Sequence, residues 1–138
     1  MKIVYLTRKE LLEIHTKVVK ETNSRDDNFP VIFEGNLDYC VEAPQEEFFG
    51  EEIHKTIHEK AATIICKIDK LHPFLDGNKR TGFAACDVFL RMNGFMMKVE
   101  RGTAIETSLK IAQCLMDIDE TSDFIKNNSR ANNAAEFE

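Results

Sequence analysis

The chain has 138 residues, of which 43% are hydrophobic and 30% charged, and its net charge at pH 7 is -6. This length suits a single domain, and an acidic chain with scattered basic residues is a poor general binder of nucleic acid. The most apolar stretch, residues 61–68, is too short to cross a membrane, and the first residues lack a signal-peptide core and cleavage site. We therefore predict a cytoplasmic protein with no direct nucleic-acid or membrane partner.

The first third of the chain predicts two helical segments and a loop. Residues Thr7 to Glu10 have the T-x-x-E form of a capping box, so a helix should begin at Arg8 and run to about Lys20. His15 lies on its apolar face, where a satisfied buried histidine is more usual than a ligand. Residues 22–30 are rich in Asn, Ser and Asp, which favours a loop, and residues 37–41 fit one or two helical turns.

The middle of the chain predicts two long helices joined by a polar turn. Apolar residues recur at helical spacing over residues 51–71, and Pro73 should end that helix. A second helix should run from about Gly77 to Asn93. His54 and His58 lie four residues apart, but no H-E-x-x-H glutamate or third ligand accompanies them. We interpret both as surface histidines and not as a zinc site.

The last third predicts shorter elements. Residues 95–99 fit a brief extended stretch, and Thr103 to Glu106 form a second T-x-x-E pattern that should open a helix. Asp117 and its neighbours resemble a calcium loop but lack the required glycine and glutamate, so we reject calcium. A short helix should follow, and an Asn- and Ala-rich tail should be mobile. We therefore predict an all-α fold with one domain over residues 1–127 and a mobile tail over 128–138.

The turn between the two long helices carries the chemistry of the chain. Residues His72 to Arg80 place an imidazole, a carboxylate, a glycine, an amide, an ammonium and a guanidinium within nine positions. Imidazole can accept a proton near neutral pH, a carboxylate can hold Mg²⁺, and free N–H groups at a helix N-terminus bind anions. A guanidinium adds paired donors for phosphate oxygens. This combination predicts phosphoryl or nucleotidyl transfer.

At these residues the sequence resembles the Fic/Doc (Fido) family of transferases. The family motif is H-x-F-x-[D/E]-[G/A]-N-[G/K]-R, and it is matched by His72, Phe74, Asp76, Gly77, Asn78, Lys79 and Arg80. The lysine at position 79 is similar to the death-on-curing (Doc) branch, and the similarity extends from about residue 5 to residue 127. The resemblance implies a compact helical bundle with the motif loop between two central helices. It also implies a small flap near residues 43–50 that docks the target's main chain by strand addition. Alternatively, Phe48 and Phe49 cover the edge of the core.

The residue chemistry and the resemblance imply the same roles for the motif. His72 would be the general base toward a hydroxyl of a target protein, and Asp76 would bind Mg²⁺ that bridges the phosphates of ATP. Gly77 and Asn78 would shape the anion nest. Phe74 would be the apolar side chain that fixes the position of the loop.

Lys79 and Arg80 would bind phosphate, and Arg80 would act in catalysis by neutralising charge on the transferred group. Many Fic proteins have a second arginine three residues after the first, where this chain has Phe83. The absence of this second arginine removes a partner for the terminal phosphate. It therefore favours transfer of phosphate over transfer of adenylate, as in a protein Ser/Thr kinase. The resemblance implies a toxin with a translation factor as a candidate target. A non-catalytic binding scaffold and a metal-dependent phosphohydrolase remain alternatives.

The resemblance also bears on regulation. Self-restraining Fic proteins carry an inhibitory [S/T]-x-x-x-E-[G/N] helix, and no such string occurs in these 138 residues. The Doc resemblance instead implies an antitoxin that folds onto the protein in trans.

Overall fold

A computed structural model describes residues 2–22 and 30–132 of the chain. Its helices are α1 (Arg8–Thr22), α2 (Glu34–Glu42), α3 (Ile57–Leu71), α4 (Asn78–Met92), α5 (Arg101–Ala112) and α6 (Ile118–Asn127), with a short 3₁₀ turn η1 (Ala43–Gln45). The strands form two antiparallel pairs, β1 (Glu47–Phe48) with β2 (Glu51–Glu52) and β3 (Phe95–Met97) with β4 (Ser129–Ala131). The predicted all-α class is confirmed.

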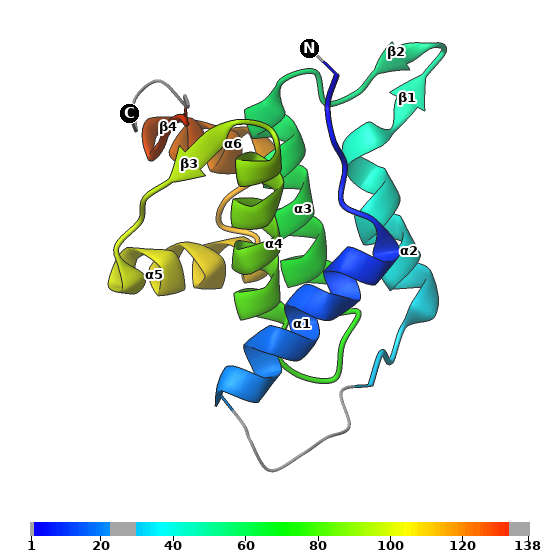
Figure 1. The fold of residues 1–138 in the computed structure, drawn as a ribbon, viewed down its shortest axis with the longest axis vertical. Helices are drawn as coiled ribbons and strands as arrows, with labels where there is room; N and C mark the ends of the chain where they lie inside the picture. Colours follow the sequence, from blue (N-terminus) through cyan, green and yellow to red (C-terminus); the bar gives the residue numbers. More distant parts are fainter. Residues whose placement is uncertain (1, 23–29, 133–138) are drawn as a thin grey trace.

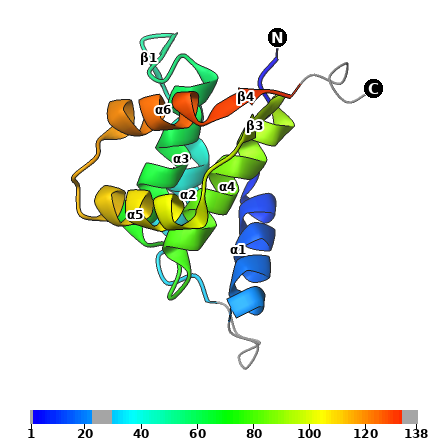
Figure 2. The ribbon, with the colours of Figure 1, turned by 90° about the vertical axis from the view of Figure 1, so that its left-hand side faces the viewer.

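Helices α3 and α4 form the centre of the molecule, and the other helices pack around them (Figure 1). Helices α1 and α2 cover one side of this pair, and α5 and α6 cover the other (Figure 2). Ile65 and Ile68 of α3 and Phe89 and Leu90 of α4 are buried in the core. The motif loop therefore lies at one end of the best-packed pair of helices, which gives it a rigid base.

The beginning of α1 was predicted correctly from a local signal, whereas the beginning of α3 was not. The predicted capping box at α1 is present, because Glu10 N donates to Thr7 Oγ1 at 3.1 Å and Thr7 N donates to Glu10 Oε1 at 3.0 Å. Helix α3 begins at Ile57 and not at residue 51, and Thr56 caps it by accepting from Glu59 N. The prediction was wrong here because residues 51–52 pair with residues 47–48 instead of continuing the helical pattern.

The C-terminal part differs from prediction in two details. Helix α5 begins at Arg101 and not at the second T-x-x-E pattern, so Thr103 lies inside it and its carbonyl accepts from Thr107 Oγ1. Residues 129–131, expected in a mobile tail, form strand β4 beside β3, because an adjacent strand satisfies their backbone groups. Residues 133–138 of that predicted tail lie outside the described residues.

Asp117, considered for calcium and rejected, has a structural role. It caps α6 by accepting from Glu120 N at 2.8 Å, and Glu120 accepts in return from Asp117 N. Within the described ranges, no helix combines the length and apolarity that crossing a membrane requires.

Candidate active site

The motif loop begins where α3 ends at His72. The backbone of His72 is left-handed, with φ 46° and ψ 61°, and its N–H donates to Ile68 O at 3.1 Å. This conformation is uncommon for a residue other than glycine, and the proline that follows cannot continue the helix. The side chain of His72 is exposed, so its imidazole is accessible to a substrate.

Phe74 and Asn78 fix the loop from inside. Phe74 is 1% exposed, and its backbone forms two hydrogen bonds with the buried Asn78 side chain. Asn78 Nδ2 donates to Phe74 O at 2.9 Å, and Phe74 N donates to Asn78 Oδ1 at 3.1 Å. The Asn78 side chain thus closes the loop, and only its backbone N–H is left to face an anion.

His15 of α1 also supports the loop. Its ring stacks on Phe74 with 3.6 Å between the ring centroids, and its Nε2–H donates to Asp76 O at 2.8 Å. Burial lowers the pKa of His15, while the hydrogen bond to the Asp76 carbonyl and the charge of Asp76 oppose that shift. His15 is therefore a satisfied structural histidine, as the sequence favoured, and it connects α1 to the site.

The N-terminus of α4 provides the donors for an anion. Gly77 adopts φ 78°, and a Cβ there would lie 3.0 Å from Val19 Cγ2, so this position requires glycine. Its N–H donates to Asp76 Oδ1 at 2.8 Å, and the first helical hydrogen bond runs from Thr81 N to Gly77 O. The N–H groups of the first turn, residues 78–80, therefore have no helical acceptor. They are suited to phosphate oxygens.

A groove adjoins these donors. It has a volume of about 790 Å³ and lies between α4, β3 and α5, with the exposed Lys79 and Arg80 on its wall. Its apolar lining includes Phe83, Ala84, Met97, Val99, Ile105 and Leu109. Ile105 and Leu109 are about half exposed, at 53% and 44%. The charged side chains of its lining are Lys79, Arg80, Arg101, Glu21 and Asp87, so the groove combines a small excess of cations with apolar walls, a composition that suits a nucleotide.

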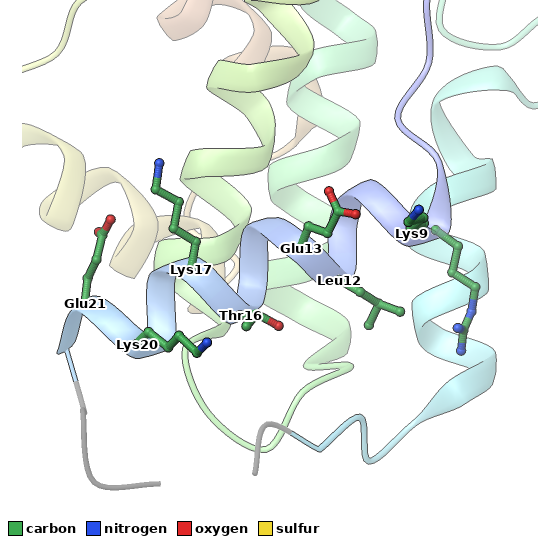
Figure 3. A pocket seen from close by; sticks show the side chains of 8 residues that line it. Lys9, Leu12, Glu13, Thr16, Lys17, Lys20 and Glu21 are labelled. Carbon is green, nitrogen blue, oxygen red and sulfur yellow. The ribbon is translucent and has the colours of Figure 1, made fainter. Parts of the chain in front are cut away.

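A second hollow, of about 910 Å³, lies along α1 (Figure 3). Its described lining consists of α1 residues only, and Lys17 and Lys20 are accompanied there by Glu13 and Glu21. Its four cations, Arg8, Lys9, Lys17 and Lys20, outnumber these two acids, but none of the motif residues lines it. We therefore place the candidate site at the groove beside the motif.

The donor set near Asp76 fits a magnesium ion held partly by substrate. Asp76 is exposed, and one of its carboxylate oxygens accepts from Gly77 N. Residues 2–22 and 30–132 contain no group of three or more His, Cys, Asp or Glu side chains that could hold a metal ion. Mg²⁺ commonly binds through one or two carboxylates together with phosphate oxygens and water. Asp76 would thus hold the ion only together with bound phosphates.

The hairpin β1–β2 forms where the flap was predicted, but not beside the motif. It precedes the N-terminus of α3, whereas His72 ends that helix, and 15 residues of helix span about 22 Å (Figure 1). The predicted small hairpin is therefore confirmed, and its role in docking a target stays a prediction. Phe48 and Phe49 are 66% and 92% exposed. The alternative, in which Phe48 and Phe49 cover the core, is wrong because both side chains are exposed.

Residues 30–33 also contact the motif loop. Val31 forms an isolated antiparallel bridge with Phe74, and Ile32 N donates to Pro73 O at 2.9 Å. Leu75 N donates to Pro30 O at 3.2 Å. The short apolar run 31–33 was the only signal in the sequence for this contact. The residues 23–29 that precede it, part of the predicted loop, lie outside the described ranges.

Sequence reasoning also missed the far wall of the groove and one acidic side chain. Met97 and Leu109 follow the motif by many residues, so nothing local connects them to it. Asp69 lies on α3 three residues before His72 and is completely buried. A carboxylate inside an apolar helical pattern was its only signal.

Comparison with known proteins agrees with this geometry. Residues 5–90 match the model of the Fic/DOC family, so the chain belongs to that family. The chain is 31% identical over 87 residues to the protein named Toxin Doc of Mycolicibacterium smegmatis. This alignment covers 60% of the chain and 67% of that relative. The resemblance seen in the motif is confirmed, and its likeness to Doc is supported by a relative of that name.

Proposed function

We propose that this protein is a Doc-like toxin that transfers a phosphate group from ATP to a hydroxyl of a target protein. The observation that carries the proposal is the arrangement at the N-terminus of α4. Exposed His72 and Asp76 lie in the motif loop, and exposed Lys79 and Arg80 lie in the first turn of α4, whose N–H groups have no helical acceptor. Lys79 and Arg80 also line a groove with room for a nucleotide. Membership in the Fic/DOC family and the similarity to a protein named Toxin Doc support it.

The proposed step is an in-line displacement at the γ-phosphorus of ATP. His72 accepts the proton of the target hydroxyl, the hydroxyl oxygen bonds to phosphorus, and the bond to the β,γ-bridging oxygen breaks to release ADP. The N–H groups of residues 78–80, the Lys79 ammonium and the Arg80 guanidinium stabilise the negative charge of the phosphates. Asp76, together with the phosphates, would hold Mg²⁺, which would supply further charge neutralisation.

The choice of phosphate over adenylate rests on Lys79 and Phe83. Phe83 lines the groove with an apolar ring at the position where a second arginine would bind a terminal phosphate. A triphosphate placed with its α-phosphorus toward His72 therefore lacks a partner for its terminal phosphate. The opposite orientation brings the γ-phosphorus to His72 and keeps Lys79 and Arg80 as partners.

The test is transfer from labelled ATP with Mg²⁺ to proteins of a host lysate, followed by intact-mass analysis of the modified target. We expect a phosphate-sized addition, and an adenylate-sized addition would instead establish adenylyl transfer. Free phosphate without protein labelling would indicate a phosphohydrolase. Binding of a partner without any ATP turnover would indicate a scaffold.

Replacing His72 by alanine should abolish transfer and preserve nucleotide binding, because the base and the phosphate contacts are separate groups. His54→Ala is the matched control, since His54 precedes the opposite end of α3 and is remote from the motif loop. Wild-type transfer rates in the His72→Ala protein would refute the proposed mechanism.

We further propose that an antitoxin restrains the protein in trans. The 138 residues contain no inhibitory helix motif, so restraint by that motif within these residues is excluded. Expression without a partner should then arrest growth, and the His72→Ala variant should not. Unimpaired growth of cells that contain the folded wild-type protein would contradict the toxin function.

A further inference from the structure

The tip of the β1–β2 hairpin exposes two aromatic side chains. The hairpin projects from the body of the molecule, and Phe49 at its tip is the most exposed large hydrophobic residue of the described ranges (Figure 1). The rings of Phe48 and Phe49 meet edge to face with 4.5 Å between their centroids, and both remain accessible to another molecule. Single exposed apolar residues are ordinary, whereas an exposed apolar cluster commonly marks a site of interaction.

The backbone of Phe49 is as unusual as its exposure. Phe49 has φ 52° and Gly50 has φ 81°, and these two residues connect the paired strands. Positive φ at both central residues is what a type I′ turn requires, and asparagine, aspartate or glycine usually occupies the first position. A bulky side chain in that conformation is an outlier. Neither burial nor backbone preference therefore accounts for a phenylalanine at position 49, whereas contact with a partner accounts for it.

The base of the hairpin is fixed to the body of the protein. Ile53 N donates to Glu46 O at 3.0 Å, which closes the hairpin. Lys60 of α3 is 0% exposed, and its Nζ donates to Pro44 O and to Glu52 Oε1, both at 3.2 Å. A surface that is ordered before binding loses little conformational entropy when a partner binds. The hairpin therefore presents its tip in a fixed position.

The charges around the tip define the chemistry of a partner. Four carboxylates flank the two rings, those of Glu46, Glu47, Glu51 and Glu52. Glu52 pairs with Lys60 and Glu51 with Lys55, but Glu46 and Glu47 form no ion pair within the described part of the chain. Carboxylates repel the phosphates of lipids and nucleic acids, and they attract lysine and arginine side chains. The complementary surface is therefore that of a basic protein.

We propose that the β1–β2 hairpin docks a partner protein that has an apolar pocket bordered by lysine and arginine side chains. The rings of Phe48 and Phe49 enter the pocket, and the carboxylates of Glu46 and Glu47 face the cations at its border. Side-chain insertion is the mode of docking, because strands of two residues each offer few backbone groups to a third strand. The motif loop lies at the opposite end of α3, so this docking does not use it and does not rest on the proposed function.

The first experiment needs no partner. Phe49→Asn gives the turn a residue type that type I′ geometry favours, so it should raise the urea midpoint of unfolding if Phe49 serves binding and not the fold. Leu115→Asn is the matched control, because this leucine is 64% exposed and lacks a positive φ. Its midpoint should stay close to that of the wild type. An unchanged or lower midpoint for Phe49→Asn would show that Phe49 supports the fold and would overturn the proposal.

The second experiment identifies the partner by its chemistry. Benzoylphenylalanine, a photoreactive analogue of phenylalanine, replaces Phe49 in one protein and Leu115 in a control, and cells that contain either protein are irradiated. Both proteins carry His72→Ala, so that the proposed activity does not arrest growth. We expect an adduct that is specific to position 49, with a protein rich in lysine and arginine. An adduct with an acidic protein, a lipid, a nucleic acid or a second copy of this chain would overturn the proposal, as would the absence of a position-specific adduct.

The third experiment measures the affinity of the captured protein, once purified, by calorimetry. We expect Phe49→Asn to bind at least about thirtyfold more weakly than the wild type, because a central aromatic side chain is lost. Glu46→Gln with Glu47→Gln should weaken binding at low salt and reduce its salt dependence, because fewer charges are screened. Leu115→Asn should bind as the wild type does. Equal affinities of the wild type and Phe49→Asn would overturn the proposal, whichever protein is captured.

Discussion

Replacing Asp69 by asparagine should change how the stability of the protein depends on pH. The pKa of Asp69 is raised from its ordinary value of 3.8 to about 8 by burial. Between these two values the folded state keeps the Asp69 proton and the unfolded state has lost it. The folded state therefore binds more protons, and its stability falls as pH rises. Most of this loss is complete once pH passes the folded value of about 8.

The magnitude follows from the linkage relation. From pH 5 to pH 7 the difference in bound protons at Asp69 is close to one, so wild-type stability should fall by about 1.4 kcal/mol per pH unit, or about 2.7 kcal/mol in all. Asparagine does not titrate, so Asp69→Asn should not show this contribution. The contributions of other titrating groups, including His15, are the same in both proteins and cancel in the difference between the two pH profiles.

The assay is urea unfolding at pH 5, 6 and 7, followed by circular dichroism, with Asp123→Asn as the control for a changed net charge. We expect the curves of stability against pH for the wild type and Asp69→Asn to diverge by about 2.7 kcal/mol over this range. The Asp123→Asn curve should run parallel to that of the wild type. If the Asp69→Asn curve were also parallel, Asp69 would not be protonated in the folded protein, and the reasoning from its burial would fail.

Two further predictions concern the motif. Replacing Asp76 by alanine should weaken nucleotide binding in the presence of Mg²⁺ and change binding without Mg²⁺ little, because the carboxylate is assigned to the ion. Calorimetry with and without Mg²⁺ measures both affinities. An equal loss of affinity in the two conditions would contradict that role. Replacing Asn78 by alanine should destabilise the fold by about 2–4 kcal/mol in urea unfolding, since the buried N–H and carbonyl of Phe74 lose their partners. Asn128→Ala removes a single such bond at the end of α6 and is the matched control, so an equal cost for both variants would contradict the loop-closing role of Asn78.

Local signals in the sequence predicted the motif and the helical class. Residues His72 to Arg80 are contiguous, so their chemistry can be recognised without knowing the fold. Apolar spacing predicted the long helices, and the pairing of Thr7 with Glu10 identified the start of α1. Each of these signals acts over a few residues along the chain, where backbone geometry alone brings the groups together.

The surroundings of the motif depend on the tertiary structure. It placed the β1–β2 hairpin at the remote end of α3, and it brought β3 and α5 to the side of α4 to form the groove. It also buried Asp69 against Gly82, thirteen residues further along the chain. These relations depend on how helices pack across long separations in sequence, and side-chain volume and the burial of apolar surface determine that packing. The pattern of residues along one helix does not predict which other helix or strand will pack against it.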